Sequence, residues 1–330
     1  MTNIYENELE TALLAVSEAS LMCEAIGAEM APQALEKGDR SPVTIADFGS
    51  QALICRALYE AFPGVSIIAE EESGELMKPE NSVLLNQLVD HVNRIRPYTD
   101  ADEVLSWIEW GTKEQDPTYF WTLDPIDGTK GFVRGDQYAI SVCLVEGGEL
   151  RVAGLACPRL RIGDRTRGVV LGAVAGAGAF RLPIDLRGER TPIRVSDVDQ
   201  PASIRFLESV ETGHASHELS AVVAAYLGVQ SPPVRMDSQA KYASVALGLQ
   251  EAYLNLQPCF QHIENIWDHA GGALVVTEAG GCVTDIRGKP FDFSQGRTLA
   301  GNCGAVATNG RVHSAILDAL RAQRSCCRSE

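Results

Sequence analysis

Trp121-Thr122-Leu123-Asp124-Pro125-Ile126-Asp127-Gly128-Thr129-Lys130-Gly131-Phe132 places two carboxylates between an apolar segment and a turn. The residues from Tyr119 to Leu123 are typical of a β-strand that ends at Asp124. Pro125 stiffens the exit, and Asp127-Gly128-Thr129 has the composition of a turn that opens a helix. The two carboxylates are therefore expected to face one point.

Two carboxylates that face one point offer the hard oxygen ligands that Mg²⁺ prefers, and a carbonyl between them can add another. The free N–H groups after Gly128 suit an anion, because a helix start presents unpaired donors and the positive end of its dipole. A metal ion and a phosphate group would then meet at this stretch. A helix cap followed by a turn accounts for the same residues, and for an isolated Asp-Pro-x-Asp-Gly this alternative is the more common one.

The composition fits a globular protein with an anionic bias. The chain has 330 residues, enough for one large domain or two smaller ones that share a core. The net charge of −16 argues against nonspecific nucleic-acid binding, which relies on clustered Lys and Arg. The same charge repels phosphorylated small molecules, so an anionic substrate requires local cations, either metal ions or a few placed basic side chains.

The sequence pattern gives no indication of a membrane location. The sequence has no run of 18 apolar residues, and Met1 to Glu8 lacks the basic and apolar parts of a signal peptide. We therefore expect a cytoplasmic protein without a membrane partner. The nine cysteines are odd in number, lie mostly in apolar segments and form no Cys-x-x-Cys pair, which favours buried free thiols over a zinc site or a disulfide framework.

The first part of the chain alternates between helix and strand patterns. Apolar periodicity predicts helices over 8–30 and 48–62, and Asp47 stands where the second helix would have its N-cap. A short strand over 65–69 ends in Glu70-Glu71-Glu72. Three adjacent carboxylates are typical of a solvated loop, but one of them can also serve as a metal ligand.

The middle of the chain combines a polar insertion with a run of strands. Residues 81–116 are polar and have helical spacing on both sides of a loop, which indicates a peripheral insertion that covers the site. Strands are expected over 138–145, 150–156 and 168–180, with Gly147-Gly148 as a tight turn between the first two. Residues 183–200 are rich in turn residues and mark a boundary between two halves.

The last part alternates regularly, which argues for an α/β layer structure. Strands are predicted over 205–210, 236–238 and 252–256, and helices over 215–227, 240–248 and 268–279. Asp268 is either the cap of the last helix or a third carboxylate that faces the first two. We leave His269 out of a metal site, because Mg²⁺ prefers oxygen to imidazole.

Asp47, Glu70, the stretch 121–132 and Trp267-Asp268, in this order, resemble the magnesium-dependent, lithium-sensitive phosphatase superfamily that includes inositol monophosphatase and fructose-1,6-bisphosphatase. A closer similarity, to the 3′(2′),5′-bisphosphate nucleotidase branch, extends over nearly the whole chain. The segments that carry it are 41–47, 123–135, 213–218, 237–242, 266–272 and 277–281. The resemblance implies an α/β fold, a layered αβαβα sandwich with the site between two halves.

The resemblance also implies roles for individual residues. Two or three Mg²⁺ ions would be held by Glu70, Asp124, the carbonyl of Ile126, Asp127 and Asp268. Asp47 and Thr129 would orient and activate a water that attacks phosphorus in line. We accordingly expect an N-terminal α+β half, 1–182, with most metal ligands, and a C-terminal α/β half, 183–330, with the last metal aspartate and the substrate-binding residues.

The substrate implied by the branch is a nucleoside bisphosphate. The enzyme would hydrolyse its 3′ or 2′ phosphate in salvage linked to sulfate assimilation. Gly128 and Thr129 would contact the reacting phosphate, and Ser238 and Lys241, with His217 beside them, would bind the second phosphate or the nucleoside. Lys241 would supply the local positive charge that the composition lacks. The enzyme is expected to act as a monomer or a homodimer.

Two points leave alternatives open. Glu71 is a possible substitute for Glu70 as the metal ligand. Asn255 stands where the nucleotidase branch commonly has an arginine, and the loss of a fixed cation near the ligand weakens recognition of a bisphosphate. An inositol phosphate or a modified nucleoside phosphate of a specialised biosynthetic pathway is therefore an alternative substrate. A catalytically silent metal- or nucleotide-binding regulator is a more remote alternative.

Overall fold

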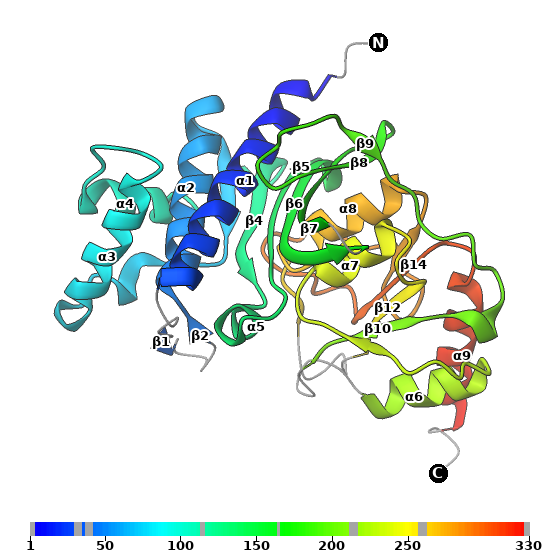
Figure 1. The fold of residues 1–330 in the computed structure, drawn as a ribbon. Coiled ribbons are helices and arrows are strands. Elements are labelled where there is room, and N and C mark those ends of the chain that lie inside the picture. The colour runs from blue at the N-terminus through cyan, green and yellow to red at the C-terminus, as the bar shows by residue number, and fades with distance from the viewer. Residues whose placement is uncertain are drawn as a thin grey trace.

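The computed structural model describes residues 4–29, 35–36, 42–112, 116–163, 166–210, 217–256 and 263–326. Two β-sheets and the helices around them form an αβαβα sandwich (Figure 1). Helices α1 (Glu6–Glu29) and α2 (Ile45–Ala61) cover the outer face of the larger sheet, and α7 (Ala240–Ala246) and α8 (Ala270–Glu278) lie between the sheets. Helices α6 (His217–Tyr226) and α9 (His313–Cys326) cover the outer face of the smaller sheet.

The layers correspond to three hydrophobic cores. In β5, Ile140, Val142 and Leu144 belong to the core under α1 and α2. The alternate residues Cys143 and Val145 belong to the middle core, which α7 and α8 share with both sheets. This alternation follows from the two-residue period of a strand, and burial on both faces explains why β5 (Ala139–Glu146) is mostly apolar. The predicted layered α/β fold is confirmed.

The larger sheet has the order β3-β4-β5-β6-β7-β8-β9, in which β3 is parallel to β4 and the other pairs are antiparallel. The predicted strand over 168–180 is wrong, because a turn at Gly176, whose φ is 75°, divides it into two strands. The strands are β3 (Ser66–Ala69), β4 (Tyr119–Asp127), β5 (Ala139–Glu146), β6 (Glu149–Ile162), β7 (Thr166–Val174), β8 (Gly178–Leu182) and β9 (Thr191–Pro192).

The smaller sheet has the order β11-β10-β12-β14-β13. Its strands are β10 (Phe206–Glu208), β11 (Val234–Arg235), β12 (Ala252–Asn255), β13 (Cys282–Thr284) and β14 (Ala305–Thr308). The predicted strand over 236–238 is wrong, since β11 ends at Arg235 and Ser238 adopts a left-handed backbone with φ of 69°. The remaining short pair is β1 (Leu35–Glu36) with β2 (Pro42–Val43).

The polar insertion forms two helices, α3 (Ser82–Asn93) and α4 (Ala101–Glu109), which pack on α2 at the edge of the molecule (Figure 1). Its helical content is as predicted, and a role in covering the site stays a prediction. Short helices complete the chain: α5 (Thr129–Arg134) and the 3₁₀ turns Ser73–Glu75, Pro79–Asn81 and Pro201–Ser203.

Helix α1 is long and apolar enough to cross a membrane by length and composition alone. In the structure it packs against α2 and the larger sheet, and residues such as Leu13 and Val16 are buried in the core. The same composition is expected of a core helix in a globular protein, so α1 is explained by its packing.

Among the cysteines whose side chains the structure describes, all but one follow the expectation of free thiols. The free cysteines are Cys23, Cys55, Cys143 and Cys157, which are buried, and Cys282, which is half-buried. Burial raises the pKa of these thiols and keeps them in the neutral form. Cys303 is disulfide-bonded, so the prediction of a free thiol is wrong at this position.

Candidate metal and phosphate site

Asp124 and Asp127 both lie in β4, which extends further than the sequence predicted. Asp124 pairs with Ser141 and Asp127 with Ala139 of β5, and the register shifts between them. This irregularity lets two residues three positions apart in one strand serve the same site. The Ser50 hydroxyl donates to the carbonyl of Pro125 over 2.7 Å, which ties the irregular segment to α2.

Gly128 and α5 follow directly and pack closely on the start of α7. Gly128 has φ of 86°, a conformation that side chains disfavour. A Cβ at this position would also lie 3.0 Å from the Cβ of Ser238. The glycine thus allows Thr129, at the start of α5, to lie beside the loop that carries Ser238.

Asp47 is joined to Thr129, as the expected catalytic pair requires. The Thr129 hydroxyl donates to Asp47 Oδ1 over 3.0 Å, and Asp47 Oδ2 accepts from the N–H and the hydroxyl of Thr44 over 2.8 and 2.6 Å. Asp47 is not the N-cap of α2: Thr44 is, and Asp47 closes the capping box three residues later. The aspartate therefore has a capping function on one oxygen and a contact with the site on the other.

The acidic residues expected to bind metal influence one another. Burial raises the pKa of the Asp124 carboxyl well above its ordinary value, and the negative charges of Glu70, Asp127 and Asp268 raise it further. Burial, followed by Asp127, Glu264 and Glu70, likewise raises the pKa of Asp268. The structure therefore brings Glu70, Asp124, Asp127 and Asp268 into one electrostatic cluster, although they come from distant parts of the chain.

Asp127 has the mildest shift of the three aspartates. Burial raises its pKa to about 6, while the Lys241 charge and the N–H of Gln239 oppose this shift. The Gln239 N–H donates to Asp127 Oδ2 over 2.5 Å. Asp127 is thus the carboxylate that connects the acidic cluster to the start of α7.

The donor set fits a divalent cation. Asp124 is 1% exposed and its Oδ1 atom has no hydrogen-bond partner among the described residues, so one carboxylate oxygen of the cluster is buried without compensation. The Ile126 carbonyl oxygen lies 3.2 Å from the Thr129 hydroxyl, which also contacts Asp47. No three His, Cys, Asp or Glu side chains in the described ranges form a metal-holding group by themselves. Mg²⁺ commonly takes one or two carboxylates and completes its shell with water and phosphate, so these residues suit it.

The charge of Glu70 affects the pKa of more of the aspartates than the charge of Glu71 does. Glu70 raises the pKa of Asp124, Asp127 and Asp268, whereas Glu71 contributes to Asp124 after the other three acids. Both residues are fixed at the end of β3, because the Gln51 amide exchanges hydrogen bonds of 2.8 and 2.6 Å with the backbone of Glu71.

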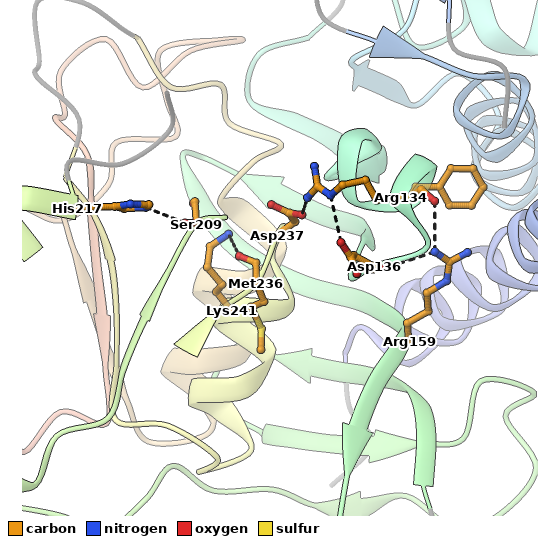
Figure 2. Close-up of polar contacts among 9 residues, drawn as sticks. Arg134, Asp136, Arg159, Ser209, His217, Met236, Asp237 and Lys241 are labelled. Carbon is orange, nitrogen blue, oxygen red and sulfur yellow. Dashed lines mark hydrogen bonds and ion pairs between the residues drawn. The ribbon is translucent and has the colours of Figure 1, made fainter. Parts of the chain in front are cut away.

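Lys241 and Ser238 lie on the other side of Asp127. Lys241 is 4% exposed, its Nζ donates to the carbonyl of Met236 over 3.3 Å, and it lies 5.0 Å from the ring centroid of Tyr253 (Figure 2). Burial lowers its pKa, while Asp127 and Asp237 oppose that shift. The Ser238 hydroxyl accepts from the N–H of Ala240 over 3.1 Å. A buried cation thus stands next to the acidic cluster, as predicted.

His217 begins α6 and its Nε2 lies 3.0 Å from the carbonyl of Ser209. Figure 2 shows Ser209 between His217 and Lys241. Among the hydrogen bonds between described residues, none joins His217 to Ser238 or Lys241. The structure therefore leaves the placement of His217 beside these two residues a prediction.

Gln239 is a site residue that the sequence reasoning missed. Its side chain is buried, donates to the carbonyl of Trp267 and accepts from the N–H of Gly272, both over 2.9 Å. Together with its backbone bond to Asp127, these contacts connect the two sequence motifs that carry aspartates. The only signal in the sequence was an amide within the motif 237–242, which does not reveal such distant partners.

A buried polar network surrounds His269 and Asn255. The Asn255 amide donates to Glu264 over 3.0 Å, the other Glu264 oxygen lies 3.3 Å from His269 Nε2, and His269 Nδ1 lies 2.6 Å from the Tyr242 hydroxyl. Both ring nitrogens of His269 are engaged, which confirms its assignment as a satisfied polar residue. The amide nitrogen of Asn255 is engaged by Glu264, whereas its buried Oδ1 atom has no hydrogen-bond partner among the described residues.

A cavity of about 310 Å³ lies beyond the C-terminal end of α5, next to Asp237. Arg134 pairs there with Asp136 and Asp237, and Arg159 donates to the Asp136 carbonyl over 3.1 Å (Figure 2). These ion pairs hold the end of α5 against the residue that precedes Ser238. Arg134 and Arg159 thus contribute to the geometry of the site through their contacts with Asp136 and Asp237.

Comparisons with known proteins show similarity over nearly the whole chain. A family model described as the inositol monophosphatase family matches residues 6–325. Proteins named 3′(2′),5′-bisphosphate nucleotidase are similar over almost their whole length: one from Oryza sativa is 40% identical over 97% of this chain and 95% of its own, and one from Emericella nidulans is 39% identical over 96% and 98%. A third, from Schizosaccharomyces pombe, is 37% identical over 97% of both chains.

Solved structures share the fold. The Thermotoga maritima IMPase superposes with a TM-score of 0.67 at 21% identity and covers 96% of this chain and 97% of its own. The inositol monophosphatase from Anabaena (Nostoc) sp. gives a TM-score of 0.64 at 21% identity, with 97% of both chains covered. The family model and the relatives match nearly all residues of the chain, and the solved structures share its layered fold. The chain therefore belongs to the inositol monophosphatase family.

Proposed function

We propose that this protein is a Mg²⁺-dependent phosphomonoesterase that removes the 3′ (or 2′) phosphate of adenosine 3′(2′),5′-bisphosphate. The observation that carries the proposal is the hydrogen bond from Thr129 to Asp47 beside the acidic cluster. The names of the relatives, which are about 40% identical and similar over their whole length, support the nucleotide substrate. We extend the proposal to 3′-phosphoadenosine 5′-phosphosulfate, which carries the same 3′ phosphate.

The proposed metal ligands are Glu70, Asp124, the Ile126 carbonyl, Asp127 and Asp268, for two or three Mg²⁺ ions. When bound, Mg²⁺ supplies the positive charge that makes water a nucleophile near neutral pH and offsets charge on the phosphoryl oxygens. Asp124 contributes a buried oxygen without a hydrogen-bond partner. Asp127 connects the ligands to α7 through the N–H of Gln239.

The proposed proton path uses the catalytic pair. The Thr129 hydroxyl donates a hydrogen bond to Asp47 Oδ1. The lone pairs of the Thr129 oxygen can therefore accept a proton from a water. The other oxygen of Asp47 accepts two hydrogen bonds from Thr44, which fix the orientation of the carboxylate toward Thr129. As the water oxygen bonds to phosphorus, the bond to the ribose oxygen breaks on the opposite side, and the products are inorganic phosphate and the nucleoside 5′-phosphate.

Substrate recognition is assigned to Gly128, Thr129, Ser238, Lys241 and His217. Binding of the second phosphate of the substrate depends on Lys241, because this residue is a buried cation in an otherwise acidic site. We place the enzyme in the cytoplasm, as a monomer or homodimer, in salvage linked to sulfate assimilation. We also propose that Li⁺ inhibits it; full activity in millimolar Li⁺ at modest Mg²⁺ would contradict this.

A second candidate keeps the chemistry and changes the substrate. Asn255 carries no charge and its amide is already bonded to Glu264, so this position supplies no cation for a second phosphate. This favours an inositol phosphate or a modified nucleoside phosphate as the alternative.

The test is phosphate release in the presence of Mg²⁺ with five substrates: adenosine 3′,5′-bisphosphate, adenosine 2′,5′-bisphosphate, inositol 1-phosphate, fructose 1,6-bisphosphate and AMP. We expect the adenosine bisphosphates to have the highest kcat/KM. Activity led by inositol 1-phosphate would retain the catalytic site and discard the nucleotide assignment. Absence of hydrolysis with all five would favour the silent regulator.

A further inference from the structure

Arg297 belongs to a segment that runs alongside the residues before Asp268. Its carbonyl accepts from the N–H of Ile266 over 3.1 Å, and Leu299 donates to the carbonyl of Glu264 over 2.8 Å. Asn265 and Thr298 form an isolated β-bridge between these two bonds. The backbone of Arg297 is thereby fixed against the motif that carries the last metal aspartate.

The side chain of Arg297 connects this motif to the larger sheet. Its guanidinium lies 4.8 Å from the ring centroid of Trp267, the residue before Asp268. Nη2 donates to the carbonyl of Ala69 over 2.8 Å, and Ala69 is the last residue of β3, immediately before Glu70. One exposed side chain thus contacts the neighbours of two acidic residues that stand 198 positions apart (70 and 268).

We propose that Arg297 is a positioning residue for the metal site, which holds Glu70 of the larger sheet in register with Asp268 of the region between the sheets. This inference rests on the proposed Mg²⁺-dependent function. Metal affinity depends on ligand orientation, and partners behind the ligands commonly contribute a large part of it. A planar guanidinium can stack on an indole and donate to a carbonyl at the same time, which a lysine ammonium does less well.

A different role for the same cation predicts the opposite result. Glu72 and Glu70 oppose the lowering of the Arg297 pKa by burial, so the charge of Arg297 is felt at Glu70. If Arg297 acted only as a charge, it would repel Mg²⁺, and its removal would strengthen Mg²⁺ binding. If it positions the ligands, its removal weakens Mg²⁺ binding.

The experiment is calorimetric titration of Mg²⁺ into the metal-free full chain without substrate, for wild type, Arg297→Met and Arg297→Lys. Arg190→Met is the matched control, because Arg190 lies at the same distance of 4.8 Å from the ring of Phe180 and pairs with Glu6 on α1. We expect Arg297→Met to raise the Kd for Mg²⁺ about ten- to a hundredfold. Arg297→Lys should fall between it and the wild type, and the control should bind as the wild type does.

Kinetics separate positioning from a general loss of structure. Raising Mg²⁺ should restore most of the kcat of Arg297→Met, with KM for the phosphorylated substrate unchanged, because Arg297 contacts neither substrate nor reacting atoms. Unchanged or tighter Mg²⁺ binding in Arg297→Met would overturn the inference. If this variant does not fold, Arg297→Lys decides: weaker Mg²⁺ binding than in the wild type would support the inference, and wild-type affinity would overturn it, because lysine keeps the charge but lacks the planar guanidinium. Wild-type protein that neither binds Mg²⁺ nor releases phosphate would instead refute the proposed function, and with it this inference.

Discussion

Asp47 illustrates how one side chain can serve stability and chemistry together. One carboxylate oxygen closes the capping box of α2 through Thr44, and the other accepts from Thr129. A capping box is worth about 1 kcal/mol, so a change at Asp47 is expected to have a modest structural cost. A loss of activity far beyond this cost therefore reports on the site.

We predict that Asp47→Asn lowers kcat about a hundredfold or more while Mg²⁺ binding persists, because the amide cannot accept a proton from the Thr129 path. Steady-state phosphate release and Mg²⁺ titration measure the two effects. Glu103→Gln is the matched control, since Glu103 closes the equivalent capping box of α4 with Asp100, away from the acidic cluster. Unchanged turnover in Asp47→Asn would refute the proton path and favour another base.

At the scale of elements, sequence reasoning succeeded where the signal was local. The helix over 8–30 and the strand over 65–69 appear as α1 and β3 within two residues, because apolar periodicity and turn residues mark such elements directly. It failed where tertiary contacts decide. The strand over 236–238 is predicted from the alternation of strand and helix patterns, but Ser238, which packs closely against Gly128, has a left-handed backbone that no strand contains.

The candidate site shows the same division. The acidic residues were found from motifs and family resemblance, since the aspartates each stand in a recognisable stretch. Gln239 and Arg297 were missed because their partners lie far away in the sequence, Asp127 and Trp267 for one and Ala69 and Trp267 for the other. The sequence contains no spacing that relates such residues, so only the folded chain reveals them.

His313, at the start of α9, is expected to make the free energy of unfolding depend on pH. His313 is buried, its Nε2 lies 3.0 Å from the Thr284 hydroxyl, and its Nδ1 lies 3.0 Å from the Thr308 hydroxyl. Burial lowers its pKa from the ordinary 6.5, and the positive end of the helix dipole acts in the same direction. Folding therefore favours the neutral ring, whose stabilising contribution is complete above the unfolded pKa and is lost as the pH falls through the folded pKa.

We accordingly expect the free energy of unfolding of the wild type to fall relative to that of His313→Gln between pH 7 and pH 5, whereas protonation of the acidic cluster acts in both proteins alike. Glutamine keeps a donor and an acceptor but does not titrate. Urea denaturation of both proteins at the two pH values measures the difference. An identical fall in the variant would assign the acid sensitivity to other groups.

At the scale of the whole molecule, the acidic cluster is a source of instability that a cation relieves. Burial and the negative charges of neighbouring acids raise the pKa of Asp124 and of Asp268, and Asp124 has no hydrogen-bond partner on one buried oxygen among the described residues. A ligand that binds only the folded chain stabilises it by mass action, by about 2.7 kcal/mol at a hundred times its Kd. Mg²⁺ should therefore raise the thermal unfolding midpoint well beyond the effect of NaCl at equal ionic strength.

We predict that Asp124→Asn raises the unfolding midpoint of the metal-free protein and greatly reduces the further rise with Mg²⁺, because it removes one buried charge and one metal ligand together. Differential scanning calorimetry with and without Mg²⁺ measures both effects. Lower stability of the metal-free variant together with an undiminished Mg²⁺ effect would place the metal elsewhere.

The middle core, in which α7 and α8 pack on both sheets, has a consequence for dissecting the gene. These helices are encoded in the second half of the chain, yet α8 covers the inner face of the larger sheet, which is built from the first half. A fragment cut in the connection near residue 190 would leave a broad apolar face open to water, and its complement would carry the missing cover. The two pieces are therefore candidates for co-expression and reassembly, not for separate crystallisation.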